Sequence, residues 1–185
     1  LRAIGRADVA LLVLDATELV TAQDMHVAGY IQQEIKGVVV VVNKWDLIAD
    51  KDLTEWNTGI RSYLKFIAYA PVLYTSAKFK QEVDKILPQA RQVYQERLKR
   101  LPTAEVNDVI QQAVATHNLP RSGRKRLKVR YATQAEVNPP TFVFFVNDAR
   151  LIHFSYRRYL ENKLRQAFGF TGTPVRLVFK AKAES

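Results

Sequence analysis

The sequence predicts an α/β protein: residues 1–98 form a parallel sheet with helices on its faces, and residues 99–183 form a small α+β domain of the order αββαβ. Two apolar runs without alternation, Val9–Leu14 and Val38–Val42, indicate strands buried on both faces of a sheet. Each expected strand of the first part precedes a helical pattern, which is typical of βαβ units. The excess positive charge falls in the second part, and this asymmetry indicates two domains.

The boundaries in the first part follow from a few residues. Thr17 or Thr21 suits the N-cap of the first long helix, Gly37 ends that helix and Pro71 ends the next one. Apolar residues of this second helix recur every three or four positions, which places them on one face. The expected elements are a strand over Asp8–Asp15, a helix over Thr21–Ile35, a strand over Val38–Asn43, a helix near Lys51–Tyr69, a strand over Val72–Thr75 and a helix from Gln81 or Glu82 to about Lys99.

The second part has a different pattern, with shorter strands and more basic residues. Thr103 suits an N-cap, Pro139 and Pro140 indicate a turn between two strands, and Gly169 suits a helix C-cap. The expected elements are a helix over Thr103–Thr116, a basic loop over Arg121–Arg126, strands over Leu127–Thr133 and Thr141–Val146, a helix over Ile152–Phe168 and a strand over Pro174–Lys180.

The composition excludes several classes of protein. Of the 185 residues, 48% are hydrophobic and 25% are charged, which is the composition of a folded globular chain. No apolar run approaches the roughly 20 residues that a membrane helix needs. The chain has no cysteine, and its three histidines share no metal-ligand spacing. We expect a cytoplasmic protein without a membrane partner.

Two polar motifs directly follow neighbouring buried strands. Asn43-Lys44-Trp45-Asp46 comes after the second expected strand, and Ser76-Ala77-Lys78 comes after the third. Loops at the carboxyl ends of parallel strands are where open α/β sheets bind ligands. The alternative interpretation is that Asn43 and Asp46 only cap the following helix.

The two motifs resemble N-K-x-D and S-A-K, with which P-loop GTPases recognise guanine. The resemblance implies that the Asp46 carboxylate accepts from guanine N1–H and N2–H, a donor pair that adenine lacks. Asn43 would tie the loops together, and the aliphatic stem of Lys44 would lie along the purine. The Ala77 N–H would donate to guanine O6 while Ser76 holds its loop. The implied nucleotide-binding residues are Asn43, Lys44, Asp46, Ser76, Ala77 and Lys78.

Longer blocks are similar to the EngA/Der family of tandem-G-domain bacterial GTPases, and Phe154–Asn162 (FSYRRYLEN) is the most specific of them. The resemblance implies that residues 1–98 are the C-terminal part of the second P-loop GTPase domain and residues 99–183 a KH-like domain. It also implies GTP/GDP and Mg²⁺ as cofactors, and action on the large ribosomal subunit precursor and its ribosomal RNA. The other carrying blocks are Arg6-Ala7-Asp8, Leu11–Thr17, Val41–Leu47, Ala70-Pro71, Thr75–Lys78, Tyr131–Gln134, Pro139–Phe142, Phe145–Asp148 and Gly169–Leu177.

The residues that bind phosphate in such GTPases are absent from this sequence. It contains neither G-x-x-x-x-G-K-[ST] nor D-x-x-G. Asp15 ends an apolar strand, but Ala16-Thr17-Glu18 follows, so we expect a strand-end or turn residue and not a Mg²⁺ ligand. We expect a piece of a longer GTPase, with more sheet and further G-domain segments upstream of Leu1. This piece would have no catalytic or metal-binding residue of its own and would not hydrolyse GTP alone.

The positive charge of the second part predicts contact with RNA, with a solvated face or a contact with the acidic G domains as the alternatives. Residues 97–185 carry 17 Lys and Arg against 6 Asp and Glu. Tyr131, Tyr156 and Tyr159 are candidates for stacking on bases, with core packing as the alternative. Gly169–Gly172 fits the G-x-x-G pattern of KH domains, but we interpret it as coincidence because it joins a helix to a strand. The candidate RNA-binding residues are Arg121, Arg124, Lys125, Arg126, Lys128, Arg130, Arg157 and Arg158.

A rival hypothesis is a non-enzymatic RNA- or ribosome-binding module in which the half G domain is only structural. A phosphate-binding loop encoded upstream of Leu1 would decide in favour of the GTPase.

Overall fold

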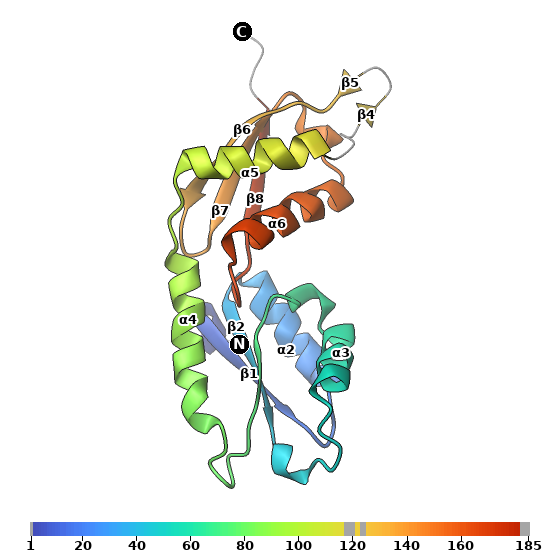
Figure 1. Ribbon diagram of the computed structural model, residues 1–185, viewed down its shortest axis with the longest axis vertical. Coiled ribbons are helices and arrows are strands. Elements are labelled where there is room, and N and C mark those ends of the chain that lie inside the picture. The colour runs from blue at the N-terminus through green and yellow to red at the C-terminus, as the bar shows by residue number, and fades with distance from the viewer. Residues whose placement is uncertain (1, 117–120, 123–124, 182–185) are drawn as a thin grey trace. The chain divides into compact units, whose positions relative to one another are not determined.

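The computed structural model describes residues 2–116, 121–122 and 125–181, with only the backbone described at residues 121, 122 and 125. It divides into two compact units, each coloured by residue number in Figure 1. Unit 1 comprises Leu1–Arg97 and Phe170–Pro174, and unit 2 comprises Leu98–Gly169 and Val175–Ser185.

Unit 1 is an alternation of strands and helices. Its regular elements are α1 (Arg2–Arg6), β1 (Val9–Asp15), α2 (Ala22–Gln33), β2 (Gly37–Asn43), the 3₁₀ helix η1 (Trp45–Leu47), α3 (Leu53–Tyr63), η2 (Lys65–Ile67), β3 (Val72–Tyr74), η3 (Val83–Lys85) and α4 (Ile86–Leu98, whose last residue falls in unit 2). The strands form a parallel sheet in the order β1-β2-β3, as the βαβ pattern predicted.

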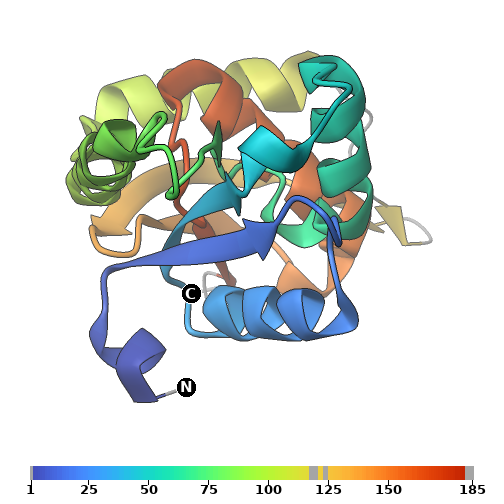
Figure 2. The same ribbon diagram turned by 90° about the horizontal axis from the view of Figure 1, so that it is seen from below.

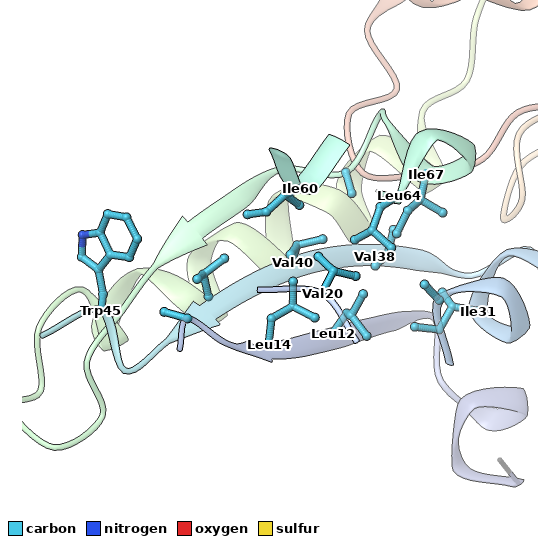
Figure 3. Packing of buried hydrophobic residues seen from close by; sticks show 14 residues of the cluster. Leu12, Leu14, Val20, Ile31, Val38, Val40, Trp45, Ile60, Leu64 and Ile67 are labelled. Carbon is cyan, nitrogen blue, oxygen red and sulfur yellow. The ribbon is translucent and has the colours of Figure 1, made fainter. Parts of the chain in front are cut away.

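Apolar side chains cover both faces of the central strand. Leu14 of β1 and Val40 of β2 pack with α2 and with Ile60 of α3 in one core cluster, which Figure 3 shows from close by. On the opposite face Val39 packs with Val93 of α4. Figure 2 shows α2 running alongside β1. Strands β1 and β2 pair along their whole length, from Val9 with Gly37 to Asp15 with Asn43. Their carboxyl ends therefore lie side by side at the same edge of the sheet.

Burial on both faces holds for β2 but not for β1. Leu11 and Val13 of β1 are 41% and 57% exposed, whereas Leu12 and Leu14, which point to the opposite face, are buried. The apolar run therefore predicted the strand correctly and its burial only in part.

A segment from late in the sequence completes unit 1. The Val38 N–H donates to Gly172 O (2.7 Å), and the Gly172 N–H donates to Tyr69 O (2.8 Å). Gly172 has φ +72°, and an added Cβ would lie 2.2 Å from a methyl group of Val93. The G-x-x-G pattern thus has a structural explanation, since Gly169 is the C-cap of a helix, as expected, and Gly172 lies against β2.

Unit 2 is an α+β unit. Its elements are α5 (Thr103–Thr116), β4 (Arg121–Ser122), β5 (Lys125–Arg126), β6 (Val129–Glu136), β7 (Thr141–Val146), the 3₁₀ helix η4 (Ala149–Leu151), α6 (Phe154–Phe168) and β8 (Arg176–Ala181). Strand β7 lies between antiparallel β6 and parallel β8. One face of this sheet carries Phe142 and Phe144, which are fully buried. The expected order αββαβ is confirmed, with the short β4–β5 hairpin added.

Several boundaries differ from the expectation for physical reasons. The helix near Lys51–Tyr69 is two helices, because buried Leu64 leaves helical geometry between α3 and η2. Gln81 does not begin a helix, because it forms a β-bridge with Ser76. Thr103 is the first helical residue, and its hydroxyl lies 3.1 Å from that of Thr133.

Of the two residues proposed as N-cap of the first long helix, Thr17 and Thr21, the structure confirms Thr21. Thr21 is the N-cap of α2, and its hydroxyl accepts from the backbone N–H of Asp24. The Asp24 carboxylate accepts in return from the Thr21 N–H, so the two residues form a capping box. Thr17 does not cap this helix and contacts Asp15.

Candidate functional site

The two predicted motifs lie side by side at the carboxyl edge of the parallel sheet. Backbone hydrogen bonds join them, because the Thr75 N–H donates to Val42 O (2.8 Å) and the Trp45 N–H donates to Thr75 O (3.0 Å). The sheet register therefore extends beyond the ends of β2 and β3 into both loops.

Side chains of the motifs also bind across the two loops. The Ser76 hydroxyl donates to Asp46 Oδ1 (2.5 Å), and the Ala77 N–H donates to Asn43 Oδ1 (3.0 Å). Ser76 is fully buried, whereas Asp46 and Asn43 are half-buried. The cross-loop role expected for Asn43 is thus present in the geometry. Each motif orients the other's polar side chains.

The loop of the second motif is closed on itself. Ser76 and Gln81 exchange two backbone hydrogen bonds, of 3.0 and 3.1 Å. The Phe79 N–H donates to the Ser76 hydroxyl (3.3 Å). Lys78 is exposed, with its Nζ 5.2 Å from the centre of the Phe79 ring, which is itself 64% exposed.

Lys44 is held by a residue outside both motifs. Its backbone is left-handed, with φ 61°, and its Nζ lies 2.5 Å from Asp15 Oδ2. Asp15 Oδ1 accepts from the Thr17 N–H (3.0 Å) and hydroxyl (2.7 Å). The bond from Lys44, followed by those from Thr17, lowers the pKa of Asp15 to about 2, and Asp15 raises the pKa of Lys44.

The ion pair of Asp15 and Lys44 is therefore present at neutral pH. A depressed carboxylate pKa means that the pair is present above the ordinary value of 3.8 and is lost as the pH falls through about 2. Asp15 is a strand-end residue, as expected. Its contact with Lys44 was not predicted, although Asp15 and Asn43 are register partners at the ends of β1 and β2.

An aromatic cluster packs around Trp45 of the first motif. Trp45 is 5% exposed, and its ring lies 4.4 Å from that of Tyr74 and 5.0 Å from that of Trp56. Burial raises the pKa of Tyr74. Because Trp45 stands between Lys44 and Asp46, its packing fixes the backbone from which both side chains extend.

The described part of the basic stretch forms an ordered cationic edge on unit 2. Arg126, Lys128 and Arg130 are exposed, whereas the intervening Leu127 and Val129 are buried, so the predicted alternation of exposure is present. The expected strand over Leu127–Thr133 is displaced, because β6 begins only at Val129 and Lys128 lies between β5 and β6.

Asn147 fixes the backbone of this edge. Its Oδ1 accepts from the Lys128 N–H (2.8 Å), and its Nδ2 donates to Arg126 O (2.9 Å). Its own backbone N–H donates to Lys128 O (3.1 Å). Arg124 lies outside the described residues, and Arg121 and Lys125 are described only by their backbone in β4 and β5.

The other candidate RNA-binding residues of unit 2 differ in how exposed their side chains are. Arg157 and Arg158 are exposed on α6, with the Arg157 guanidinium 5.2 Å from the centre of the Phe179 ring. Tyr156 is 3% exposed, and burial raises its pKa to about 12, so it is a core residue.

The remaining two tyrosines also differ. The Tyr159 hydroxyl donates to Ala113 O (2.8 Å). Tyr131 is 43% exposed and stacks on Phe145. Of the three tyrosines considered for stacking, only Tyr131 presents a large exposed surface.

Within the described ranges, no three His, Cys, Asp or Glu side chains are grouped so that they could hold a metal ion. None of the helices over these same ranges is long and apolar enough to cross a membrane.

A parallel sheet with two linked polar loops at its carboxyl edge is the architecture of a GTP-binding domain. In agreement, residues 1–120 match the family model described as the elongation factor Tu GTP binding domain. Residues 100–180 match the model described as the KH-domain-like region of EngA bacterial GTPase enzymes, C-terminal.

Curated relatives match nearly the whole chain. GTPase Der of Alkaliphilus oremlandii is 49% identical over 183 residues, which are 97% of this chain and 41% of that protein. GTPase Der of Desulfitobacterium hafniense is 50% identical over 186 residues, which are 100% of this chain and 42% of that protein. The chain belongs to the EngA/Der family of bacterial GTPases. It spans about two fifths of the length of these relatives.

Solved structures of GTP-binding proteins align with this chain only at low scores. A probable GTP-binding protein, engB, aligns with a TM-score of 0.44 at 21% identity, over 52% of this chain and 61% of that chain. Era in complex with MgGDPNP and nucleotides 1506–1542 of 16S ribosomal RNA aligns with a TM-score of 0.43 at 20% identity, over 98% and 67%.

Proposed function

We propose that this chain is the guanine-recognising and RNA-contacting part of a GTP-hydrolysing protein that acts in assembly of the large ribosomal subunit. One observation carries the guanine assignment: the two loops are joined by the bonds from Ser76 to Asp46 and from Ala77 to Asn43. Donors of the second loop thus hold two acceptors of the first loop in place, which preorganises this edge for a planar base. The domain boundary would fall between residues 98 and 99.

Each motif residue has a defined task in this proposal. Ser76 orients one Asp46 oxygen, so the carboxylate presents a fixed pair of acceptors to guanine N1–H and N2–H. Lys44, held by Asp15, lies along the purine face. Lys78 flanks the base from the second loop, where it is exposed. The Ala77 N–H donates to Asn43 in the structure, so recognition of guanine O6 requires it to share or exchange that acceptor.

The whole protein would supply what this sequence lacks. GTP hydrolysis needs a phosphate-binding loop and Mg²⁺ ligands, which further segments of the G domain would provide. Those segments would also cover Leu11 and Val13, which are exposed on β1. Arg126, Lys128 and Arg130, with Arg157 and Arg158, would contact phosphates of ribosomal RNA in the cytoplasm.

The test is a change of base preference in the full-length protein, with the nucleotide site of its other G domain disabled. Asp46→Asn replaces one acceptor by a donor, so GTP should bind more weakly by about 1–3 kcal/mol. Xanthosine triphosphate carries a carbonyl at C2 and should bind better than it does to the wild type. Titration of both nucleotides, with Asp50→Asn as a matched control outside the motif, measures the change. Unchanged preference for GTP would remove Asp46 from base recognition.

A further inference from the structure

One face of the unit 2 sheet carries a stacked aromatic pair, of which Tyr131 is exposed and Phe145 is half-buried. The Tyr131 and Phe145 rings stack with centroids 4.3 Å apart and planes at 13°. Tyr131 is 43% exposed, although an exposed aromatic ring of this size gains from being covered. A direct chain neighbour of each ring, Ala132 after Tyr131 and Phe144 before Phe145, is fully buried, so the pair lies on the face opposite the core.

Strand register extends this pair into a row across the sheet. Tyr131 pairs with Phe145, and Phe145 pairs with Lys180 of β8. Lys180 is exposed. The row therefore places a cation beside two stacked rings on one face of the sheet.

The row lies at the basic end of the sheet. Arg130 directly precedes Tyr131, and both are exposed because the pairing of β6 with β7 shifts register between Val129 and Tyr131. The ordered cationic edge with Arg126 and Lys128 continues from Arg130. The opposite end differs, because Glu136 and Arg176 both pair with Thr141 and supply opposite charges to that row. Positive charge on this face is thus concentrated beside the aromatic pair.

We propose that the Tyr131–Phe145–Lys180 row is a stacking platform for an unpaired base of single-stranded RNA, with the adjoining cations on its phosphates. A base presents a flat π-face to Tyr131, as in other sheet surfaces that bind single strands. A duplex cannot present such a face without unstacking a base. The row therefore selects unpaired RNA, whereas the cationic edge binds any RNA. This inference rests on the RNA contact proposed above and names where bases, rather than phosphates, are bound.

The experiment compares a uridine 12-mer with a 12-base-pair RNA duplex, by anisotropy titration with the 185-residue chain at several salt concentrations. Tyr131→Ala should weaken binding of the single strand by about 5- to 100-fold, leave the duplex within about twofold and leave the salt slope unchanged. Tyr131→Phe keeps the ring and should bind like the wild type. Phe154→Ala removes a 78% exposed aromatic ring elsewhere on unit 2 and should also have no effect. Lys180→Gln should lower the salt slope by about 0.7.

The outcomes separate this inference from the broader RNA proposal. If a folded Tyr131→Ala variant binds the single strand as tightly as the wild type does, the proposed platform is wrong. An equal loss for strand and duplex would also overturn it, because such a loss indicates a structural role. If substitution of Arg126, Lys128 and Arg130 still lowers the salt slope, the RNA contact stands and only the platform fails. If the wild type binds neither RNA, both proposals fail.

Discussion

The two sheets carry their candidate sites in different places. In unit 1 the site lies beyond the strand ends, in loops whose side chains bind one another across β2 and β3. In unit 2 the candidate residues lie on the strands themselves, as exposed cations and a stacked ring pair. A loop site depends on the sheet beneath it, whereas a surface of strand residues depends on its charges and rings. Changes to packing and changes to charge should therefore affect the two units differently.

The largest expected effect comes from packing against β2. Gly172→Ala places a Cβ 2.2 Å from Val93 in a left-handed conformation, so unit 1 should lose about 2–3 kcal/mol of unfolding free energy. Urea unfolding followed by tryptophan fluorescence measures this, because both tryptophans, Trp45 and Trp56, lie in unit 1. The matched control is Gly29→Ala in α2, which meets nothing within 4 Å and should gain about 0.5–1 kcal/mol. Equal stability of the two variants would contradict the packing of Gly172 on β2.

An intermediate effect should come from charge on unit 2. Replacing Arg126, Lys128 and Arg130 together by Gln should lower RNA affinity roughly tenfold or more and reduce the salt slope by about 2. Different RNA sequences should lose affinity about equally, because phosphate contacts carry no direct sequence information.

The control for this variant removes the same charge from unit 1. Lys51, Lys65 and Lys80 are exposed, and their replacement by Gln should leave the salt slope unchanged. The unfolding midpoint of both triple variants should stay near that of the wild type. If the two triple variants lower the slope equally, RNA binding follows net charge and not the cationic edge.

The smallest effect should come from the ion pair beside the first motif. Asp15→Asn should weaken GDP binding to the full-length protein by about two- to fivefold, because an exposed ion pair contributes little. It should also lower the pKa of Lys44, which NMR of the Lys44 Cε signal measures.

Glu18→Gln is the matched control for Asp15→Asn. It removes an exposed carboxylate near Lys44 that is not its ion-pair partner, so both readouts should change less. A Lys44 pKa that Asp15→Asn leaves unmoved would show that the pair does not form in solution.

The comparison also explains what the sequence could predict. Asn43, Lys44 and Asp46 are contiguous and follow a buried strand, so their pattern is visible without a structure. Asp15 was missed as a partner of Lys44, because the contact depends on the register of β1 with β2. In unit 2 the shared exposure of Arg126, Lys128 and Arg130 was predictable, because side chains two residues apart in an extended segment point to the same side.

Other features depend on tertiary packing and could not be predicted from the sequence. Tyr131 and Tyr156 each have an arginine as a direct neighbour, but Tyr156 is buried and Tyr131 is exposed. No local pattern indicated that Gly172 lies against Val38 and Val93, because this contact joins segments more than seventy residues apart. Helix ends near Leu64 and Gln81 were misplaced for the same reason, since a buried side chain and a β-bridge decided them.

We expect the two loops of unit 1 to bind guanine even without the rest of the G domain. This is measured by NMR of the 185-residue chain titrated with GDP and, separately, with ADP. GDP should produce saturable shifts of the backbone amides at Lys44, Asp46 and Ala77, at millimolar concentration because phosphate contacts are missing. ADP should leave these signals unmoved, since it lacks the paired donors that Asp46 accepts. Equal shifts with GDP and ADP, or none with GDP, would show that these loops do not recognise guanine.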